Sequence, residues 1–284
     1  MNYVLTGFSD EYTPDFIGQL EGMNKLGVKF IELRFVDGEN FSDLSDERMD
    51  FVANSLEKYG IKVSAMGSPL GKIDVDDDFA PHIKKAEKVY KFAKRLNCKY
   101  VRAFSFYFKN KTREEVREKA FERIEKLLSL AEKYDLVLCH ENEADIYGES
   151  PEQCLEILQR FGGRLRAVFD MGNFVLKGYE PYPHAYELLK DYIEYFHIKD
   201  ATTDRVIVPC GEGDGHVKDI LLSYKKDFNR ENVFVSMEPH LFAFTGLDKL
   251  GDVELKRAYS FPTSADGYTY NINNMKKILE EVER

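Results

Sequence analysis

Four residues of the types that bind divalent metals each follow a short apolar run in the second half of the chain: Glu141, Asp170, His197 and Glu238. One such residue alone is more often a helix cap or a solvated charge. Three converging carboxylates, however, repel one another strongly unless a cation lies between them. Three oxygen donors and one imidazole suit Mn²⁺ or Mg²⁺, and Co²⁺ or Zn²⁺ is also compatible. We therefore predict that these four residues bind one divalent metal ion.

The segments around these residues alternate between short apolar runs and longer amphipathic ones, which predict buried strands and helices respectively. Ser150 followed by Pro151 predicts one helix start, and Gly27 and Gly60 predict two helix ends. The predicted strands are residues 3–8, 29–33, 61–66, 100–104, 136–141, 166–169, 193–198 and 233–237. The predicted helices are residues 14–26, 45–59, 81–96, 113–134, 151–161, 184–189, 217–224 and 271–282.

Eight strand–helix units in 284 residues predict one architecture. Strands that alternate with helices form parallel sheets, and eight units in a domain of this length form a (β/α)8 TIM barrel. The sequence contains no linker, low-complexity tract or repeat, so we predict one domain over residues 1–284. The carboxyl ends of barrel strands meet at one face, where active sites lie. The predicted fold therefore brings the four potential metal ligands together.

The longest segment without a predicted element is residues 239–270, after the last strand. Loops of this length are uncommon and usually functional. In a barrel we expect this segment to overhang the mouth, where it can act as a lid.

The composition argues against several classes of partner. The chain has 40 basic and 50 acidic residues, a formal charge of −10, and no basic cluster apart from acids, so nucleic acid and anionic membranes are disfavoured. No apolar run approaches the ~20 residues that span a bilayer, and the first residues do not resemble a signal peptide. The four cysteines show no CxxC spacing, which favours a reduced protein. We therefore expect a cytoplasmic protein.

Four segments at the predicted strand ends together resemble a known superfamily. They are His140-Glu141-Asn142-Glu143, Phe169-Asp170-Met171-Gly172-Asn173-Phe174, His197-Ile198-Lys199-Asp200 and Met237-Glu238-Pro239-His240. The combination is similar to the xylose-isomerase-like barrels, and within them to the sugar phosphate isomerase/epimerase group. The resemblance implies that strands five to eight supply the metal ligands, which fall on Glu141, Asp170, His197 and Glu238. Such relatives are often dimers or tetramers, so the resemblance is compatible with a homo-oligomer.

The resemblance also implies isomerisation or epimerisation through an enediolate. A divalent ion that chelates a carbonyl and a neighbouring hydroxyl acidifies the adjacent C–H bond and stabilises the developing negative charge. Glu141 and Glu238 are the expected proton-transfer pair, one on each face of the reacting carbon. The expected substrate is a small carbohydrate: a sugar, a sugar phosphate or a related polyol.

Four further residues are expected to bind substrate: Arg102, Lys199, His240 and Asn173. Arg102 is expected to point into the barrel from strand four. Lys199 and His240 each follow a predicted ligand by two residues, which places them on the same side. Asn173 stands where many relatives carry a histidine that contacts substrate or a second metal. Because an amide is a poor transition-metal ligand, a second metal is less expected here.

Structural alternatives accompany some of these assignments. Lys199 can instead form a salt bridge with Asp200 or Glu212. Glu32 and Arg34, both directed inward from strand two, are expected to pair with each other inside the barrel.

The glycine-rich loop at residues 209–216 precedes a predicted helix, a place where phosphate groups often bind. Glu212 and Asp214 would repel a phosphate there. We therefore interpret the loop as a wall of the site or the start of a helix. A non-phosphorylated substrate is as compatible with the sequence as a phosphorylated one.

Three other functions use the same scaffold. The main alternative is a metal-dependent dehydratase of the inosose type, in which an enolate forms and a β-hydroxyl is lost with nearly the same groups. A DNA-repair endonuclease needs a zinc cluster, many histidines and a basic face, whereas this acidic chain has six histidines. A non-catalytic sugar-binding barrel would bind its ligand without a metal.

Overall fold

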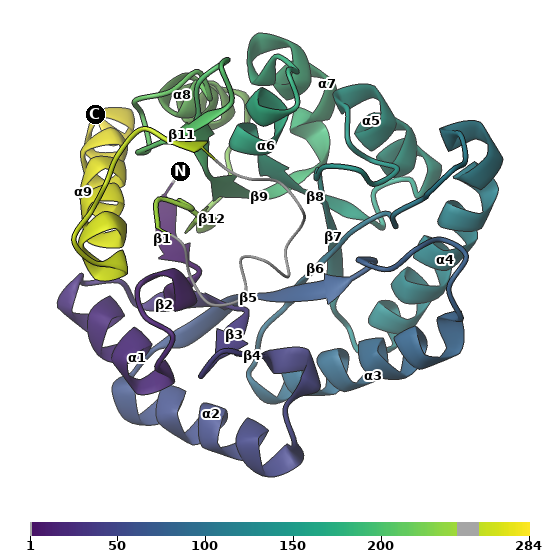
Figure 1. Ribbon diagram of the computed structural model, residues 1–284, viewed down its shortest axis with the longest axis horizontal. Coiled ribbons are helices and arrows are strands. Elements are labelled where there is room, and N and C mark those ends of the chain that lie inside the picture. Colours follow the sequence, from purple (N-terminus) through teal and green to yellow (C-terminus); the bar gives the residue numbers. More distant parts are fainter. Residues whose placement is uncertain (1, 243–255) are drawn as a thin grey trace.

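The strands of the computed structural model, which describes residues 2–242 and 256–284, form a nearly closed barrel. Eight parallel strands lie in the order β1-β12-β9-β8-β7-β6-β5-β2 (Figure 1). They are β1 (Tyr3–Gly7), β2 (Phe30–Leu33), β5 (Lys62–Leu70), β6 (Tyr100–Ala103), β7 (Val137–Glu141), β8 (Arg166–Asp170), β9 (Ile193–Ile198) and β12 (Val233–Met237). The predicted single-domain (β/α)8 barrel is confirmed.

Helices surround the barrel and cover its outer face (Figure 1). They are α1 (Phe16–Lys25), α2 (Asp46–Tyr59), α3 (Phe79–Arg95), α4 (Arg113–Lys133), α5 (Pro151–Arg160), α6 (Met171–Leu176), α7 (Tyr186–Leu189), α8 (Val217–Asp227) and α9 (Ser264–Glu283). Short elements lie between them: β3 (Phe35–Val36), β4 (Glu39–Asn40), β10 (Asp200–Ala201), β11 (Val206–Val208), β13 (Lys256–Arg257), the 3-10 helices η1 (Ser9–Glu11), η2 (Phe41–Asp43) and η4 (Lys190–Tyr192), and the π-helical turn η3 (Pro181–Ala185).

Local sequence signals explain several helix boundaries. Ser150 caps α5 by accepting the N–H of Gln153, whose side chain accepts the N–H of Ser150 in return, and Pro151 occupies the first turn. Helix α2 ends at Gly60, whose φ of 63° lies in the left-handed region. Both boundaries agree with the predictions.

Two helices differ from the sequence prediction. Helix α6 was not predicted, and it begins because the Asp170 side chain accepts the N–H of Asn173 at 2.8 Å. Helix α9 begins at Ser264 rather than at residue 271, since Thr263 caps it by accepting the N–H of Asp266. Helix α6 has only six residues, too few to show a helical apolar period, and the first turn of α9 is polar, so neither start carried the signal on which the prediction depended.

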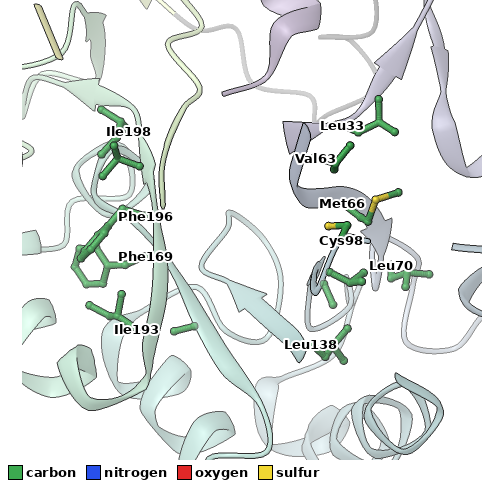
Figure 2. Close-up of a cluster of buried hydrophobic side chains, with 14 of the residues drawn as sticks. Leu33, Val63, Met66, Leu70, Cys98, Leu138, Phe169, Ile193, Phe196 and Ile198 are labelled. Carbon is green, nitrogen blue, oxygen red and sulfur yellow. The ribbon is translucent and has the colours of Figure 1, made fainter. Parts of the chain in front are cut away.

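Alternate strand residues face two separate apolar layers. Outward-facing side chains such as Phe169 and Phe196 pack in one large cluster between strands and helices (Figure 2). Inward-facing residues of four strands form a smaller cluster inside the barrel: Ala65, Cys139, Val168 and Tyr195. Cys139 therefore shares the inner side with Glu141, as strand parity predicts. Because apolar side chains fill this part of the interior, the polar inward residues gather at the carboxyl ends.

The predicted loop at residues 239–270 is only partly irregular. Residues 243–255 lie outside the described residues, so the lid prediction falls largely on a segment that the structure does not describe. Beyond that segment, β13 pairs in parallel with β11, and α9 begins before residue 270.

The four cysteines are buried free thiols: Cys98, Cys139, Cys154 and Cys210. Within residues 2–242 and 256–284, no helix combines the length and apolarity needed to cross a membrane.

Gly71, directly after β5, occupies a position that excludes a side chain. Its φ is +91°, and a Cβ atom there would lie 2.0 Å from the carbonyl oxygen of Phe104. Gly71→Ala should lower the free energy of unfolding by about 2–5 kcal/mol, since left-handed backbone costs roughly 1–2 kcal/mol and overpacking roughly 1–3 kcal/mol. The control is Gly27→Ala, where φ is +70° but no atom lies within 4 Å of the added methyl group. Urea denaturation followed by circular dichroism measures both losses, and equal losses would contradict the steric explanation.

Candidate metal centre

The four predicted ligands meet at the carboxyl ends of four adjacent strands. Glu141 ends β7, Asp170 ends β8, His197 lies near the end of β9, and Glu238 directly follows β12. One potential ligand atom from each lies within 4.8 Å of the other three, and all four residues are buried. The convergence follows from the barrel, because neighbouring parallel strands end at one face.

His197 directs its Nδ1 atom toward the other potential ligands. Nδ1 lies 2.8 Å from Glu141 Oε1 and 3.4 Å from Glu238 Oε2, whereas Nε2 lies 3.0 Å from Glu32 Oε2. Burial alone would lower the pKa of His197, but the carboxylates of Glu141 and Glu32 outweigh it and raise that pKa well above its ordinary value. The Nδ1 atom of this imidazole therefore faces the other potential ligands, and its Nε2 atom binds the carboxylate of Glu32.

Glu32 is held below the ligand cluster by two further donors. The Tyr195 hydroxyl donates to its Oε1 at 3.0 Å, and the Ser236 hydroxyl donates to its Oε2 at 2.6 Å. A histidine that binds a metal commonly donates its other N–H to a carboxylate in this way, which fixes the ring and its tautomer. The predicted pairing of Glu32 with Arg34 is wrong, because Glu32 binds His197 while Arg34 reaches acids of other strands.

Two buried arginines each bind one oxygen of a glutamate in the cluster. Arg34 donates to Glu238 Oε1 at 2.7 Å, and Arg102 donates to Glu141 Oε2 at 3.0 Å. The second oxygen of each glutamate lies near His197 Nδ1. Burial raises the pKa of both carboxyl groups, but nearby cations have the larger effect. His197 and Arg102 lower the pKa of Glu141. Lys199 and His197 hold the pKa of Glu238 well below its ordinary value. Both side chains are therefore carboxylates.

Two oxygens of the cluster lack a hydrogen bond. Asp170 Oδ2 and Glu238 Oε2 are buried and have no hydrogen-bond donor among the described residues. Lys199 Nζ lies 3.2 and 3.3 Å from them, so the ammonium forms ion pairs without a well-directed hydrogen bond. Burial raises the pKa of Asp170 to about 7 despite the opposing charge of Lys199. Buried oxygens without donors are costly, and a cation between them would satisfy both, so the donor set fits a divalent ion.

The charges at the barrel mouth also favour a cation. The described residues there include six buried carboxylates: Asp10, Glu11, Glu32, Glu141, Asp170 and Glu238. The buried residues with permanent positive charge that the structure describes at the mouth are fewer: Arg34, Arg102 and Lys199. The imidazoles of His197 and His240 complete the buried group. A bound divalent ion would offset much of the remaining negative charge.

The structure places the predicted substrate-binding residues around this cluster. Lys199 donates to Asn173 Oδ1 at 2.9 Å, and Asn173 donates in turn to the carbonyl of Asn142 at 2.9 Å. Arg102 also donates to the carbonyl of Gly67 at 3.2 Å, while its Nε is buried without a partner among the described residues. The alternative pairing of Lys199 with Asp200 or Glu212 is wrong, because Lys199 forms its ion pairs with two predicted ligands.

Asp200 instead organises the glycine-rich loop. Its carboxylate accepts the N–H groups of Gly211, Gly213 and Gly215 at 2.8, 3.1 and 3.0 Å. Glu212, on the same loop, accepts hydrogen bonds from Tyr270 and two other side chains. The backbone donors that could have bound a phosphate are therefore occupied by a carboxylate.

Sequence reasoning missed two acids that follow β1. Asp10 accepts from Arg34 Nε at 3.0 Å, and Glu11 lies 3.1 Å from Arg34 Nη2. Glu11 also forms, with Glu238 and His240, a second trio of potential metal ligands. Arg34 already supplies positive charge to both glutamates of that trio, so we assign no ion to it. The available signal was weaker than for the four potential ligands, because the Asp-Glu pair lies beyond the end of β1, in η1, where strand parity no longer applies.

Comparison with known proteins agrees with this fold. The family described as xylose isomerase-like TIM barrel matches residues 20–224. The chain belongs to this family, and the resemblance noted in the sequence is confirmed. No curated protein matches the chain.

Three solved structures illustrate the range of its structural relatives. A D-allulose 3-epimerase from Methylomonas sp., in complex with D-allulose, has a TM-score of 0.74 and 13% identity, over 97% of this chain and 96% of that one. A probable 3-DHS dehydratase, AsbF from Bacillus anthracis, has a TM-score of 0.71 and 17% identity, over 97% of this chain and 99% of that one. The IolI protein with a bound zinc atom has a TM-score of 0.72 and 20% identity, over 98% of this chain and 97% of that one. At these identities the likeness shows the fold alone.

Glu32→Gln should weaken metal binding without a change in the four ligands. The neutral amide is a weaker acceptor for His197 Nε2, and loss of such supporting partners typically lowers metal affinity by about 10–100-fold. Isothermal titration of the metal-free protein with Mn²⁺ measures the change. Tyr195→Phe is the control, because it removes one donor to Glu32 and leaves the contact with His197. Equal affinities for the wild type and Glu32→Gln would contradict the supporting role.

Proposed function

We propose that this protein is a divalent-metal-dependent isomerase or epimerase that acts on a sugar or related polyol through an enediolate. One observation carries the proposal: four buried ligand atoms from four strands lie within 4.8 Å of one another, and two of the carboxylates leave an oxygen without a donor. Mn²⁺ and Mg²⁺ suit this oxygen-rich set best, and Co²⁺ and Zn²⁺ also fit. Epimerases and a metal-containing relative among the similar folds support the same class.

Proton transfer is assigned to Glu141 and Glu238. A divalent ion, when bound, supplies Lewis-acid polarisation of a substrate carbonyl. One glutamate, as a carboxylate, removes the proton from the adjacent carbon, and the electron pair moves onto the carbonyl oxygen to give the enediolate. The other glutamate is also a carboxylate at rest and first takes up a proton from solvent; it then delivers that proton to the opposite face, which inverts the centre. Isomerisation between adjacent carbons needs only one of the two groups.

The arginines and Lys199 position the reacting groups. Arg34 and Arg102 each bind one oxygen of the proton-transfer pair, at 2.7 and 3.0 Å, so each glutamate keeps its other oxygen on the ligand side. Lys199, between Asp170 and Glu238, places an ammonium where it can donate to a substrate oxygen that carries negative charge.

Glu238→Gln should lower turnover by about 10²–10⁴-fold while the protein stays folded, because the amide cannot transfer a proton. The assay combines a screen of ketoses, ketose phosphates and inososes on Mn²⁺-loaded protein with NMR detection of solvent deuterium at carbon. Glu143→Gln, which changes an acid paired with Lys72 rather than a predicted ligand, is the control. Unchanged turnover or deuterium incorporation in Glu238→Gln would remove this residue from the mechanism.

The substrate is proposed to be non-phosphorylated. Asp200 occupies the three glycine N–H groups of the loop before α8, and buried acids outnumber permanent cations at the mouth. A phosphate dianion would therefore meet repulsion without a backbone cradle.

For any ketose that is turned over, kcat/KM should exceed that for its phosphate ester by at least about tenfold, equivalent to ~1.4 kcal/mol. Steady-state kinetics on matched pairs of free and phosphorylated sugars provide the measurement. A preference for the phosphate ester would reverse this assignment and leave the metal-dependent proton transfer intact.

A dehydratase is the second candidate, and Lys199 favours it. Loss of a β-hydroxyl requires a proton donor near the leaving oxygen, and this buried ammonium lies beside two predicted ligands. The probable dehydratase among the similar folds is consistent with this reaction. Product analysis separates the candidates, because dehydration lowers the product mass by one water whereas isomerisation leaves the mass unchanged.

A further inference from the structure

Phe8 is a fully buried aromatic residue that directly follows β1 and lies against three polar groups at the barrel mouth. Its ring centroid lies 4.0 Å from the guanidinium carbon of Arg34 and 4.9 Å from that of Arg102. The ring also meets the imidazole of His197 edge to face, with the two centroids 5.2 Å apart. The apolar clusters formed by the described residues do not include Phe8. Its surroundings are therefore those of the polar site rather than of the core.

The first strand determines the direction of this side chain. Thr6 points into the barrel, where its hydroxyl lies 2.7 Å from that of Ser64. Phe8 follows Thr6 by two residues and so has the same parity. The N–H of Phe8 donates to the carbonyl of Met237 at 3.0 Å, which extends the pairing of β1 with β12 by one residue. The ring is therefore held over the interior at the carboxyl ends of the strands.

Strand β5 leaves room for the ring at Gly67. A Cβ atom at this position would lie 2.4 Å from Cε1 of Phe8, which is closer than two such carbon atoms can approach. The carbonyl of Gly67 also accepts a hydrogen bond from Nη2 of Arg102 at 3.2 Å. The same residue thus admits the ring and orients one of the two arginines beside it.

Carboxylates and the aromatic ring bind each guanidinium group in different ways. A guanidinium donates hydrogen bonds in its plane, and it is also attracted to the negative face of an aromatic ring within ~6 Å. Arg34 donates to Glu238 at 2.7 Å. Arg102 donates to Glu141 at 3.0 Å. Both guanidinium carbons also lie over the ring of Phe8, which adds a second contact that restricts their movement.

Both arginines approach the same carboxylate oxygen. Glu238 Oε1 lies 2.7 Å from Nη1 of Arg34 and 3.9 Å from Nη1 of Arg102. Two cations that converge on one oxygen repel each other. The negative face of Phe8 attracts both and offsets part of this repulsion. Without the ring we expect the two guanidinium groups to separate, and the glutamate oxygens that they hold to change direction.

We propose that Phe8 is a positioning residue that acts through Arg34 and Arg102. Its ring holds both guanidinium groups in place, and they in turn keep one oxygen of Glu141 and one oxygen of Glu238 directed toward the other potential ligands. This inference rests on the proposed function for its effect on turnover, but its effect on metal binding can be measured without a substrate.

The first experiment changes the charge of the ring face and leaves the shape of the ring nearly constant. Phe8 is replaced by phenylalanines that carry one, two or three ring fluorines, because each fluorine withdraws electrons and weakens the attraction for a cation. Isothermal titration of the metal-free protein with Mn²⁺ should show a stepwise loss of affinity, about tenfold for three fluorines. Equal or higher affinity across the series would overturn the proposal, because fluorination keeps the apolar packing of the ring.

Phe8→Leu and Phe35→Leu form a matched pair. Both replace a buried phenylalanine beside Arg34, but the ring centroid of Phe35 lies 5.8 Å from the guanidinium carbon, farther than that of Phe8. Phe8→Leu should weaken Mn²⁺ binding by about tenfold, whereas Phe35→Leu should change it by less than about twofold. Equal losses would show that any cavity beside Arg34 has this effect, and would overturn the assignment to Phe8. If Phe8→Leu fails to fold, the fluorinated rings decide the question.

The second experiment measures steady-state kinetics of the fluorinated series at saturating Mn²⁺, on any substrate that is turned over. We expect kcat to fall with each fluorine while KM changes by less than about twofold, because the glutamates that the arginines hold are the proposed proton-transfer pair. A constant kcat would overturn the action of Phe8 on that pair. If no substrate is turned over at all, the proposed function fails, and the Mn²⁺ affinities alone decide the positioning role.

Discussion

Electrostatic repulsion among buried carboxylates is the constraint on which the rest of this structure depends. Six of them lie at one end of a barrel whose interior below is apolar. Such a group is stable only when each charge has a partner, because removing one partner from a buried pair costs roughly 3–5 kcal/mol. The polar residues of the mouth therefore form one connected set, in which a change at one position alters the charge balance of the others.

Three buried cations at the mouth each form ion pairs with different carboxylates of this set. Arg34 and Arg102 bind the outer oxygens of Glu238 and Glu141, and Lys199 lies between Asp170 and Glu238. Glu32 supports the Nε2 atom of His197, which lies on the side of the ring away from the other potential ligands. The oxygens that remain without donors among the described residues are Asp170 Oδ2 and Glu238 Oε2, and both belong to the group of residues that could hold a metal ion.

The sequence was sufficient to predict the barrel and the convergence of the four potential ligands, because both depend on local periodicity. Glu141 and Asp170 end apolar strands, and strand parity alone determines that they face inward. The partners of Arg34 were not predictable in the same way. Asp10 and Glu11 belong to a short 3-10 helix, so no strand parity applies to them, and only the closed barrel brings them to Arg34.

The barrel closes between β1 and β2, and the described residues contain no backbone ladder between these two neighbouring strands. Side chains bridge this region instead. The hydroxyl of Thr6 in β1 lies 2.7 Å from that of Ser64 in β5, which donates to the carbonyl of Ile31 in β2 at 3.0 Å, and beyond them Arg34 binds Asp10. The ion pairs of Arg34 with Asp10 and Glu11 contribute to the charge balance at the mouth, and they also connect the chain beyond β1 to the chain beyond β2, where the barrel closes. A substitution at Arg34 or Asp10 would therefore loosen the closure of the barrel as well as change the charge balance at its mouth.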